Sequence, residues 1–565
     1  MENPDVSYTV ERLDHLGIVA GVCQEIGLAE FLDEHTRGSR QRVSVGTATL
    51  AMVLNGLGFT NRRLYLVPRF FENKPIERLL GREDIKAEDL NDDCLGRTLD
   101  WLYDHDVTRL FAGIARRARE AFEFERRCLH VDTTSFSVSG EYEEAAEEEE
   151  EEEEEVICIT HGYSRDHRAD LKQWMLALGT TCEGEIPSFM RPLDGNSSDK
   201  VTLVAAVEAL QQQLREEEDT DLLDEDEPIF VADSGLYGEK NMLRLAEAGV
   251  RWVSRVPETS TMARSIIDPD APDWRSSSDG QLRWYRREVK LAPSDGEEGR
   301  LERWVVVSGQ ATEERARKTL LRKIDKEQQR WERALRRLAS RRFACEADAR
   351  GALAKETERL PAYFKVKATL KVTSHYDTPG RPGKDREPTS RSWRVKGKLR
   401  VLEEKVEGEW RRRACYILGT NVLDPETLSE EELIATYKGQ GSVERGFGFL
   451  KDPLFSASTF YVQKPERLVA LSFIMVVCLL VYRLAEHRLR RRLAQTGESI
   501  PNQLNKPTAR PTMRWVFQLF EGIELLIIRS ATGIGSQRVL RVEPAHAKIL
   551  RLLGPTFQKI YEAPT

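Results

Sequence analysis

Three carboxylates stand in contexts that suit phosphodiester chemistry. Asp132 ends the apolar run CLHVD, and Asp233 ends a second such run, IFVAD. Glu444 lies in YKGQGSVERGFGFLK, residues 437–451, which should be helical and which groups a carboxylate with hydroxyl, amide and ammonium side chains. Two aspartates on strands and one glutamate on a helix are the residue types that a nuclease with divalent metal ions requires.

The three side chains are 101 and 211 residues apart, so only a fold can unite them. In one pocket they would repel one another unless a cation lay among them. Hard oxygen ligands favour Mg²⁺ or Mn²⁺, and two such ions about 4 Å apart can support in-line attack on a phosphodiester. Taken singly, each residue is more commonly structural, because an Asp at a strand end usually forms a turn or a cap.

The hydrophobic pattern indicates the elements that must position these residues. FERRCLHVDTTSFSVSG is typical of a hairpin with the β-branched VDTT at its centre, and VICITHGYS and MLALGTT are further candidate strands. VTLVAAVEALQQQLREE predicts an amphipathic helix. The order of strand EPIFVAD, helix KNMLRLAEAG and strand VRWVSRVP predicts a parallel α/β pair.

Changes of pattern divide the chain into parts. The first part reads as helical, and its segment TNRRLYLVPRF could be a DNA-reading surface as readily as an ordinary arginine-bearing one. A middle part combines strands with a long charged helical stretch, which predicts an inserted β-rich domain with a helical pair. CYILGTNVLD should then re-enter the core as a strand. The predicted parts are residues 1–120, 121–258, 259–400, 401–490 and a basic, partly helical 491–565.

The net charge of −9 argues at first against a nucleic-acid partner. Without the 12 glutamates of residues 141–155 the formal charge would rise to +3, and the remaining chain has dense basic patches that could bind DNA in a salt-dependent way. The run itself should be a solvated loop, because adjacent like charges repel and offer nothing to bury. DNA mimicry or autoinhibition is the rarer alternative.

Eight cysteines are scattered without a CxxC pair, which disfavours a zinc ribbon and suits a reducing cytoplasm. The start, MENPDVSYTVERLDHLG, has no signal-peptide pattern. Leu468–Tyr482 is an uncharged run of 15 residues. A membrane-spanning helix needs about 20 apolar residues, so a buried core helix is the better interpretation and a membrane anchor the minority one.

Five segments occur in an order that resembles bacterial insertion-sequence transposases of the DDE class: HVDTTSF, HGYSRDHRADLKQ, PLDGNSSD, VADSGLYGEKN and VERGFGFLK. The similar branch has a Y-R-E-K signature, spaced Y-x2-R-x3-E-x6-K. Tyr437, Glu444 and Lys451 fit this spacing, whereas position 440 carries Gln in place of the usual Arg. The resemblance covers about residues 120–490. It implies an α/β protein whose RNase H-like catalytic core is interrupted by a β-rich insertion domain and preceded by a helical N-terminal, DNA-binding domain.

The resemblance also implies a function. It predicts cut-and-paste transposition, with nicking at the transposon ends, attack by a 3′-hydroxyl and a hairpin intermediate. Asp132, Asp233 and Glu444 would hold two Mg²⁺ or Mn²⁺ ions. The partners would be transposon-end DNA with terminal inverted repeats, target DNA and a second copy of the chain in a homodimer. The setting would be the nucleoid of a bacterial or archaeal cytoplasm, away from membranes.

Several side chains are candidates for DNA contacts by the same analogy. Tyr437 and Lys451 would contact phosphates near the cleavage site. Gln440 can donate a hydrogen bond but lacks the charge and fork of a guanidinium, so Arg445 is a candidate substitute. Trp252 could stack on a flipped base, although a core tryptophan is the commoner role.

Other basic segments offer weaker signals. Arg165, Arg168 and Lys172 could form a phosphate-contacting turn or a plain polar hairpin. The helical stretch 315–342 mixes acidic and basic residues, which is typical of a solvated face. The stretch 487–493, HRLRRRL, is purely basic and is the better candidate for phosphate contacts.

Three other functions stay open at this point. A decayed transposase would bind DNA without cleaving it, and Gln440 with the glutamate run motivates this alternative. A membrane-associated protein would use Leu468–Tyr482 as its anchor. A structure-selective nuclease of the same fold would cut without preferring repeat ends.

Overall fold

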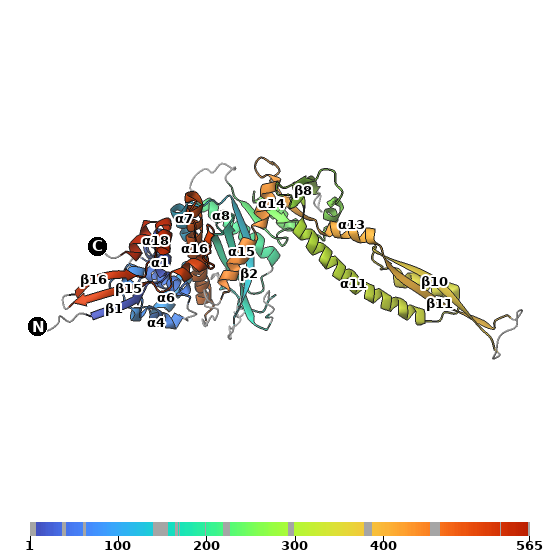
Figure 1. Ribbon diagram of the computed structural model, residues 1–565, viewed down its shortest axis with the longest axis horizontal. Helices are drawn as coiled ribbons and strands as arrows, with labels where there is room; N and C mark the ends of the chain where they lie inside the picture. The colour runs from blue at the N-terminus through green and yellow to red at the C-terminus, as the bar shows by residue number, and fades with distance from the viewer. Residues whose placement is uncertain are drawn as a thin grey trace, which may run out of the picture. The chain divides into compact units, whose positions relative to one another are not determined.

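The computed structural model divides the chain into two compact units, which are drawn in Figure 1. The first unit combines Met1–Ser254 with Glu432–Thr565, and the second is Arg255–Glu431. The structure describes residues 7–36, 41–59, 64–138, 156–163, 168, 170–197, 199–217, 227–291, 299–377, 387–452, 464–530 and 533–562. The glutamate run 141–155 lies outside these residues.

Helices fill the N-terminal part of the first unit, as the sequence pattern predicts. They are α1 (Leu16–Glu25), α2 (Leu28–Glu34), α3 (Val45–Gly56), α4 (Val67–Phe71), α5 (Ile76–Leu80), α6 (Asp92–Asp104) and α7 (Val107–Phe122), with 3-10 turns at Leu64–Leu66 and Ala87–Asp89. Side-chain caps fix the first residues of two of these helices. The Ser44 hydroxyl accepts the Thr47 N–H before α3, and the Asn91 side chain accepts the Cys94 N–H before α6.

These helices pack around α16 (Pro465–Thr496), which stands between them and the main sheet in Figure 1. Among the described helices it is the one long and apolar enough to cross a membrane, and its most apolar stretch is wholly buried. Contacts with α1, α3, α6 and α7 and with β4 (Pro187–Leu193) cover it. Since each buried Leu, Val or Phe contributes about 1.5–3 kcal/mol, α16 is the core helix of this unit.

A three-stranded antiparallel sheet brings both ends of the chain together, which the sequence did not predict. β1 (Ser7–Arg12) pairs with β15 (Glu524–Ser530), and β15 pairs with β16 (Gly533–Leu540). No residue of β1 is fully buried, and its apolar side chains Tyr8 and Val10 are exposed, so the pairing with β15 and not burial defines this strand. The other C-terminal elements are β13 (Ile500–Pro501), β14 (Pro507–Thr508), α17 (Met513–Leu519), α18 (Pro544–Leu553) and α19 (Pro555–Tyr561).

The main sheet of the first unit has the strand order β4-β3-β2-β5-β6. β2 (Cys128–Val138), β3 (Lys172–Thr181) and β4 are antiparallel neighbours, whereas β2, β5 (Ile229–Ala232) and β6 (Arg251–Arg255) run parallel. The predicted parallel pair is confirmed, with helix α9 (Glu239–Glu247) between its strands. The predicted hairpin is wrong, because VDTT pairs with β3 inside one continuous strand, β2.

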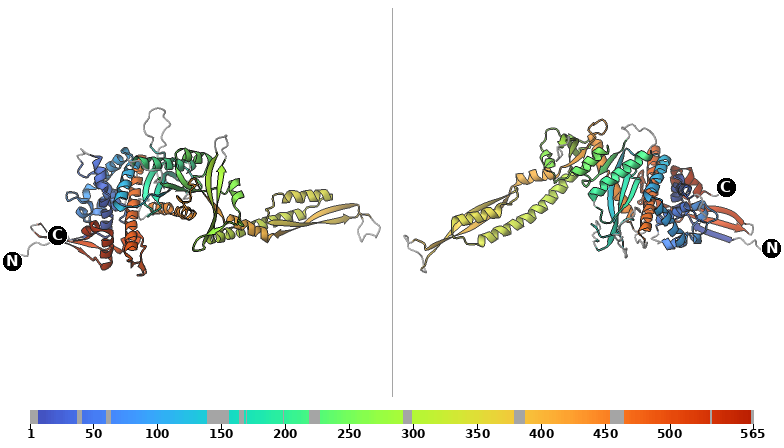
Figure 2. Two further views of the ribbon diagram at one scale, coloured as in Figure 1. Left: turned by 90° about the horizontal axis from the view of Figure 1, so that it is seen from above. Right: turned by 180° about the vertical axis from the view of Figure 1, so that it is seen from behind.

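The second unit joins a sheet to an elongated arm. Its strands β12 (Tyr416–Thr420), β9 (Arg300–Gly309), β8 (Leu282–Leu291) and β7 (Arg275–Ser276) are antiparallel neighbours. The arm packs α11 (Gln310–Ser340) and α12 (Glu346–Thr357) against a hairpin of β10 (Phe364–His375) and β11 (Ser390–Val401), as Figure 2 shows. The short helices are α10 (Thr261–Ile266) and α13 (Glu403–Arg413). The segment CYILGTNVLD contains β12, so the predicted strand is confirmed, and this strand pairs with β9.

Candidate active site

The side chains of β2 are divided between two faces of the main sheet. Leu129 joins a core cluster with residues of α8 (Asp199–Glu217) and α9. Phe136 joins the other cluster, which contains α16 and residues of α15 (Gly441–Leu450). Because side chains alternate along a strand, His130 and Asp132 share the face of Phe136, and α15 contacts β2 and β3 there.

Asp132 and Asp233 occupy matching positions on neighbouring parallel strands. β2 pairs with β5 at an offset of 101 residues, Cys128 with Ile229 and His130 with Val231. The same offset leads from Asp132 to Asp233, which follows directly after the end of β5. Neighbouring strands lie about 4.8 Å apart, and paired residues point to the same face. The fold thus unites two carboxylates that are far apart in sequence.

The segment that carries Glu444 runs along β2. Gly439 lies over His130, since a Cβ on this glycine would stand 2.9 Å from His130 Nε2. At the other end of the segment, Lys451 Nζ lies 5.5 Å from the centre of the Phe136 ring. The helix α15 between these two contacts therefore follows β2 in the strand's own direction.

These end points place Glu444 level with Asp132. A helix rises about 1.5 Å per residue, so Glu444 is roughly 7 Å beyond Gly439. A strand rises about 3.3 Å per residue, so Asp132 is about the same distance beyond His130. Two residues after Glu444, a Cβ on Gly446 would stand 3.4 Å from Leu178, the residue paired with Asp132.

Backbone groups hold both aspartates. Asp132 Oδ1 accepts the Thr133 N–H at 2.7 Å, and Asp233 Oδ1 accepts the Gly235 N–H at 2.7 Å. The Ser254 hydroxyl donates to the backbone carbonyl of Asp233 at 2.7 Å. Asp233 therefore has the turn-forming role that is common for aspartate. Its second carboxylate oxygen makes no hydrogen bond with any residue that the structure describes.

The donor set fits Mg²⁺ or Mn²⁺, which prefer carboxylate oxygens. Asp233 and Glu444 are exposed and Asp132 is half-buried. The carboxylate oxygens of Asp132, Asp233 and Glu444 do not all lie within 4.8 Å of one another. Among the described residues, the group of Cys, His, Asp or Glu side chains that meets this distance is Cys128, His130 and Cys182. An open set suits Mg²⁺, which usually binds one or two carboxylates and completes its shell with water and substrate phosphate.

The other signature residues lie on the same segment. Tyr437 is in α14 (Glu430–Lys438), and its carbonyl accepts the Gln440 N–H at 3.0 Å in the turn before α15. Tyr437, Gln440 and Lys451 are all half-buried. These three residues and Glu444 therefore lie on one continuous segment, which contacts β2 at Gly439, along α15 and at Lys451.

Arg445 points to a different partner. Its guanidinium is hydrogen-bonded to the Glu185 carboxylate in the turn between β3 and β4. Arg483 of α16 binds the same carboxylate, at 2.9 Å. The structure thus assigns Arg445 to an ion-pair network, and the proposed replacement of the missing arginine by Arg445 is not seen.

Trp252 corrects another prediction. It is 1% exposed, belongs to the cluster of α8 and α9, and packs edge-on against Tyr237 with the ring centroids 5.8 Å apart. Its ring lies in the core on the face of the sheet opposite α15, where it cannot stack on a flipped base. The commoner role, a core tryptophan on a strand, is the one observed.

The remaining basic candidates lie apart from the carboxylates or outside the described residues. Arg168 binds Asp170 with two hydrogen bonds of 2.9 Å, which is the polar-turn alternative. Lys172 begins β3 and is paired with Val138 at the end of β2. Arg165 lies outside the residues that the structure describes.

The basic stretch 487–493 lies in the C-terminal part of α16. Its arginines form ion pairs and hydrogen bonds with other parts of the protein. Arg488 pairs with Glu25 of α1, and Arg490 pairs with Glu486 at 2.7 Å. Arg491 donates to a backbone carbonyl just after α7 at 2.9 Å. These contacts correct the prediction that this stretch is a surface for phosphate, because Arg488 and Arg491 link α16 to the N-terminal helices and Arg490 pairs within α16.

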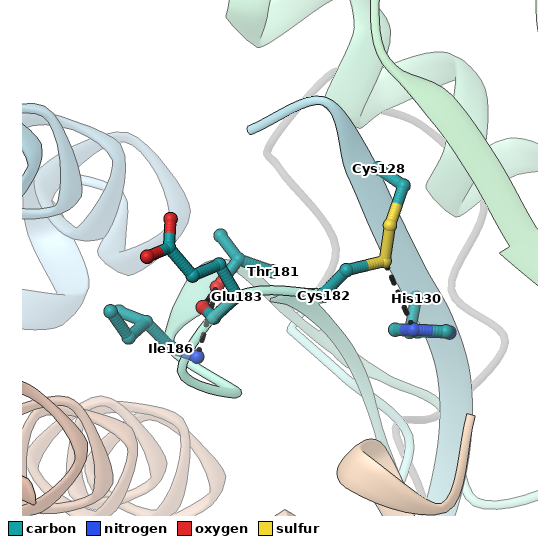
Figure 3. Close-up of a disulfide and its surroundings, with 6 residues drawn as sticks. All are labelled: Cys128, His130, Thr181, Cys182, Glu183 and Ile186. Carbon is teal, nitrogen blue, oxygen red and sulfur yellow. Dashed lines mark hydrogen bonds between the residues drawn. A yellow bond between two sulfur atoms is a disulfide. The ribbon is translucent and has the colours of Figure 1, made fainter. Parts of the chain in front are cut away.

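A pair of cysteines was missed in the sequence. Figure 3 shows Cys128 at the start of β2 joined by a disulfide to Cys182, which follows β3, with His130 beside them. The Cα atoms are 5.6 Å apart, and His130 Nε2 lies 3.1 Å from the sulfur of Cys182. A separation of 54 residues gives no sequence signal for this pair. Only the antiparallel pairing of β2 with β3 makes them neighbours, so the expectation of scattered thiols is corrected.

Two family models match parts of the chain. Residues 123–481 match the family model described as Transposase DDE domain, and residues 8–116 match a domain of unknown function, DUF4277. No curated protein matches the chain. A solved piggyBac transposase synaptic complex with hairpin DNA is similar at 9% identity over 91% of this chain and 82% of that chain, with a TM-score of 0.35, a likeness too low to carry an argument. The DDE match spans more than half of the 565 residues and includes all three carboxylates. The chain belongs to the family of DDE transposases.

Proposed function

We propose that this transposase catalyses metal-dependent cut-and-paste transposition of an insertion sequence. The observation that supports the proposal is the shared register of Asp132 and Asp233, with α15 laid along β2 so that Glu444 is level with them. The three carboxylates would hold two Mg²⁺ or Mn²⁺ ions, which supply an activated water or 3′-hydroxyl and stabilise the leaving oxygen.

The chain's own side chains would orient the DNA in this site. Lys451 and Tyr437 flank Glu444 on the same segment and would contact phosphates next to the scissile bond. The exposure of Asp233 and Glu444 leaves the carboxylates accessible to a bulky polyanion. First-strand hydrolysis at the transposon end, followed by attack of the freed 3′-hydroxyl on target DNA, would use the same three carboxylates.

The partners follow from this reaction. Transposon-end DNA with terminal inverted repeats and target DNA would be the substrates, and two ends held together call for a homodimer. The protein would act on the nucleoid in a bacterial or archaeal cytoplasm. The burial of the apolar stretch of α16 in the core supports a role away from membranes.

Cleavage of border DNA tests the proposal. Duplexes from the borders of this gene would be incubated with the protein and Mg²⁺, Mn²⁺ or EDTA, beside the variants Glu444→Gln and Glu247→Gln. Glu247 is an exposed glutamate of α9, whose helix contacts α8 on the other face of the sheet, so it is a matched control. We expect metal-dependent nicking at the repeat boundary that Glu444→Gln abolishes and Glu247→Gln retains. Full cleavage by Glu444→Gln would falsify the assignment.

A catalytically impaired remnant that only binds DNA is the second candidate function. The observation in its favour is that Gln440 brings no positive charge and that Arg445, the nearest substitute, is bound to Glu185. The remnant would bind repeat ends without nicking in any metal, and Gln440→Arg would then restore cleavage. Cleavage by the unaltered protein would exclude it.

A further inference from the structure

We propose that one face of the β10–β11 hairpin is a sequence-independent binding surface for the phosphate backbone of duplex DNA. The two strands pair over twelve positions, from Phe364 with Val401 to His375 with Ser390. Because side chains alternate along both strands, every second pair points to the same face. One face is mostly apolar, and the other is cationic along four successive pairs, from Lys365 with Arg400 to Lys371 with Arg394.

The apolar face is buried against the helices of the arm. Leu370 and Val395, which are paired, pack with Leu338 of α11 and Ala349 of α12. Gly397 lies close to α11, where an added Cβ would stand 3.0 Å from Leu335. This packing fixes which face of the hairpin is turned outward.

The outward face carries a ladder of cations, which we call the basic ladder. It consists of four successive cross-strand pairs with seven cations in eight positions: Lys365 with Arg400, Lys367 with Lys398, Thr369 with Lys396, and Lys371 with Arg394. All eight are exposed except Arg394, which is half-buried. None of the seven cations forms an ion pair or hydrogen bond with any residue in the described part of the chain.

Repulsion between the cations of the basic ladder destabilises the hairpin unless an anion binds to them. Directly opposed side chains on paired strands have Cβ atoms about 5 Å apart, and like charges there are destabilising. A solvent-exposed strand requires only polar side chains. Alternating positive and negative charges would destabilise it less than a row of like charges. The neighbouring helix α11 shows that alternative, because it interleaves cations with acids and pairs Lys323 with Glu327 and Arg336 with Glu332.

Duplex DNA is an anion whose dimensions and charge match the basic ladder. The ladder from Lys365 to Lys371 is about 20 Å long at roughly 3.3 Å per residue, and duplex DNA carries one phosphate per about 1.7 Å of its axis. A two-stranded ribbon fits the major groove, which is about 12 Å wide. Five of the seven cations are lysines, which bind phosphate as point charges without a fixed geometry, so the ladder would hold mainly the backbone and not the sequence.

This inference rests on the proposed function only in naming DNA as the polyanion. The second unit contains neither Asp132, Asp233 nor Glu444. Binding can therefore be measured in EDTA, where cleavage plays no part, and the two proposals can fail separately.

The test compares two triple variants of the full chain. The ladder variant is Lys367→Gln, Lys396→Gln, Lys398→Gln. The matched control is Arg317→Gln, Lys318→Gln, Arg322→Gln, which removes the same charge from exposed positions of α11 in the same unit. Affinity for a random duplex and for a border duplex would be measured between about 50 and about 200 mM salt.

We expect the ladder variant to flatten the plot of log K against log salt by roughly 0.9 for each phosphate contact removed, equally for both duplexes. The control variant should keep the slope of the parent. The ladder variant should also melt at or above the parent's temperature, since repulsion has been removed, which excludes misfolding as the cause. A parent-like slope in the ladder variant would overturn the proposal, as would an equal loss in the control. A loss confined to the border duplex would contradict sequence-independent binding.

Discussion

Asp132 lies in β2, and Asp233 follows directly after the parallel strand β5, at the 101-residue offset that pairs His130 with Val231. Strand pairing therefore brings the two aspartates to the same end of the sheet, and the turn after β5 orients Asp233. Because β2 is central, with β3 on one side and β5 on the other, its register is also fixed by the apolar residues that each face must bury. A rigid frame of this kind would keep the carboxylates of the proposed metal site in position.

Asp233→Asn should separate the structural role of this residue from its chemical role. Asn keeps an Oδ1 that can accept the Gly235 N–H, so the turn after β5 should persist. It loses the negative charge that a divalent ion requires, so we expect metal-dependent cleavage to fall by at least about 100-fold while the melting temperature changes little. The measurement pairs a nicking assay with thermal unfolding. Loss of both together would indicate that the turn, and not the ion, depends on the charge.

Gly439→Ala should displace the helix that carries Glu444. The new Cβ would stand 2.9 Å from His130 Nε2 and 3.1 Å from the Thr436 carbonyl, so the start of α15 must shift. Gly448 is the matched control, because it is an exposed glycine of the same helix with nothing within 4 Å of an added Cβ. Gly448→Ala should stabilise the helix by up to about 1 kcal/mol.

The nicking rates of the two alanine variants test whether the position of α15 controls cleavage. We expect Gly439→Ala to cleave more slowly than the parent by a factor of about 10 or more, because a shift of about 1 Å in a catalytic group is costly. Gly448→Ala should cleave at the parent's rate. Equal rates in both variants would mean that the position of α15 over β2 does not control Glu444.

The sequence could predict the candidate site because its signals are local. Asp132 and Asp233 each close an apolar run, and the segment around Glu444 has a fixed spacing of side chains. What brings them together, the register between β2 and β5, is a long-range pairing that no local pattern encodes. The same limit explains the missed sheet of β1, β15 and β16, and the missed bridge between Cys128 and Cys182.

Two predictions failed where burial decides the role of a residue. Trp252 and Arg488 are placed by side chains from distant parts of the chain, and the sequence shows only that one is aromatic and the other basic. The reverse holds for the basic ladder, which alternates visibly in YFKVKATLKV and SWRVKGKLRV. Its significance emerges only when the pairing shows that the cations of both strands share one face.

The disulfide predicts a definite thiol count. Of the eight cysteines, six are free and Cys128 and Cys182 are joined. A thiol reagent in denaturant should therefore find six thiols in protein purified without reductant, and eight after reduction. A bridge closing a 54-residue loop stabilises the fold by about 4 kcal/mol in the chain-entropy account, so reduction should lower the urea midpoint. Eight thiols before reduction would contradict the bridge.

Acid should destabilise the protein through two buried histidines. Burial lowers the pKa of His15 and the pKa of His130 from 6.5 to about 4. Between about pH 4 and pH 6.5 the histidines of the unfolded chain bind protons that the folded protein excludes. The free energy of unfolding is therefore highest above about pH 6.5 and falls as the pH drops toward 4. Each histidine accounts for up to about 3 kcal/mol of that loss.

His15→Gln isolates one of these contributions. His15 is 3% exposed and its Nε2 lies 2.8 Å from the Leu57 carbonyl, a hydrogen bond that a glutamine amide can also donate. The variant loses stability from packing at every pH, but its urea midpoint should fall less steeply than the parent's between about pH 7 and pH 5, because one excluded proton is gone. The control is His105→Gln, because His105 is exposed and its substitution leaves the buried imidazole of His15 in place. If His15→Gln kept the full acid dependence, the loss of stability would have to originate in other groups, and the burial of His15 would not be its cause.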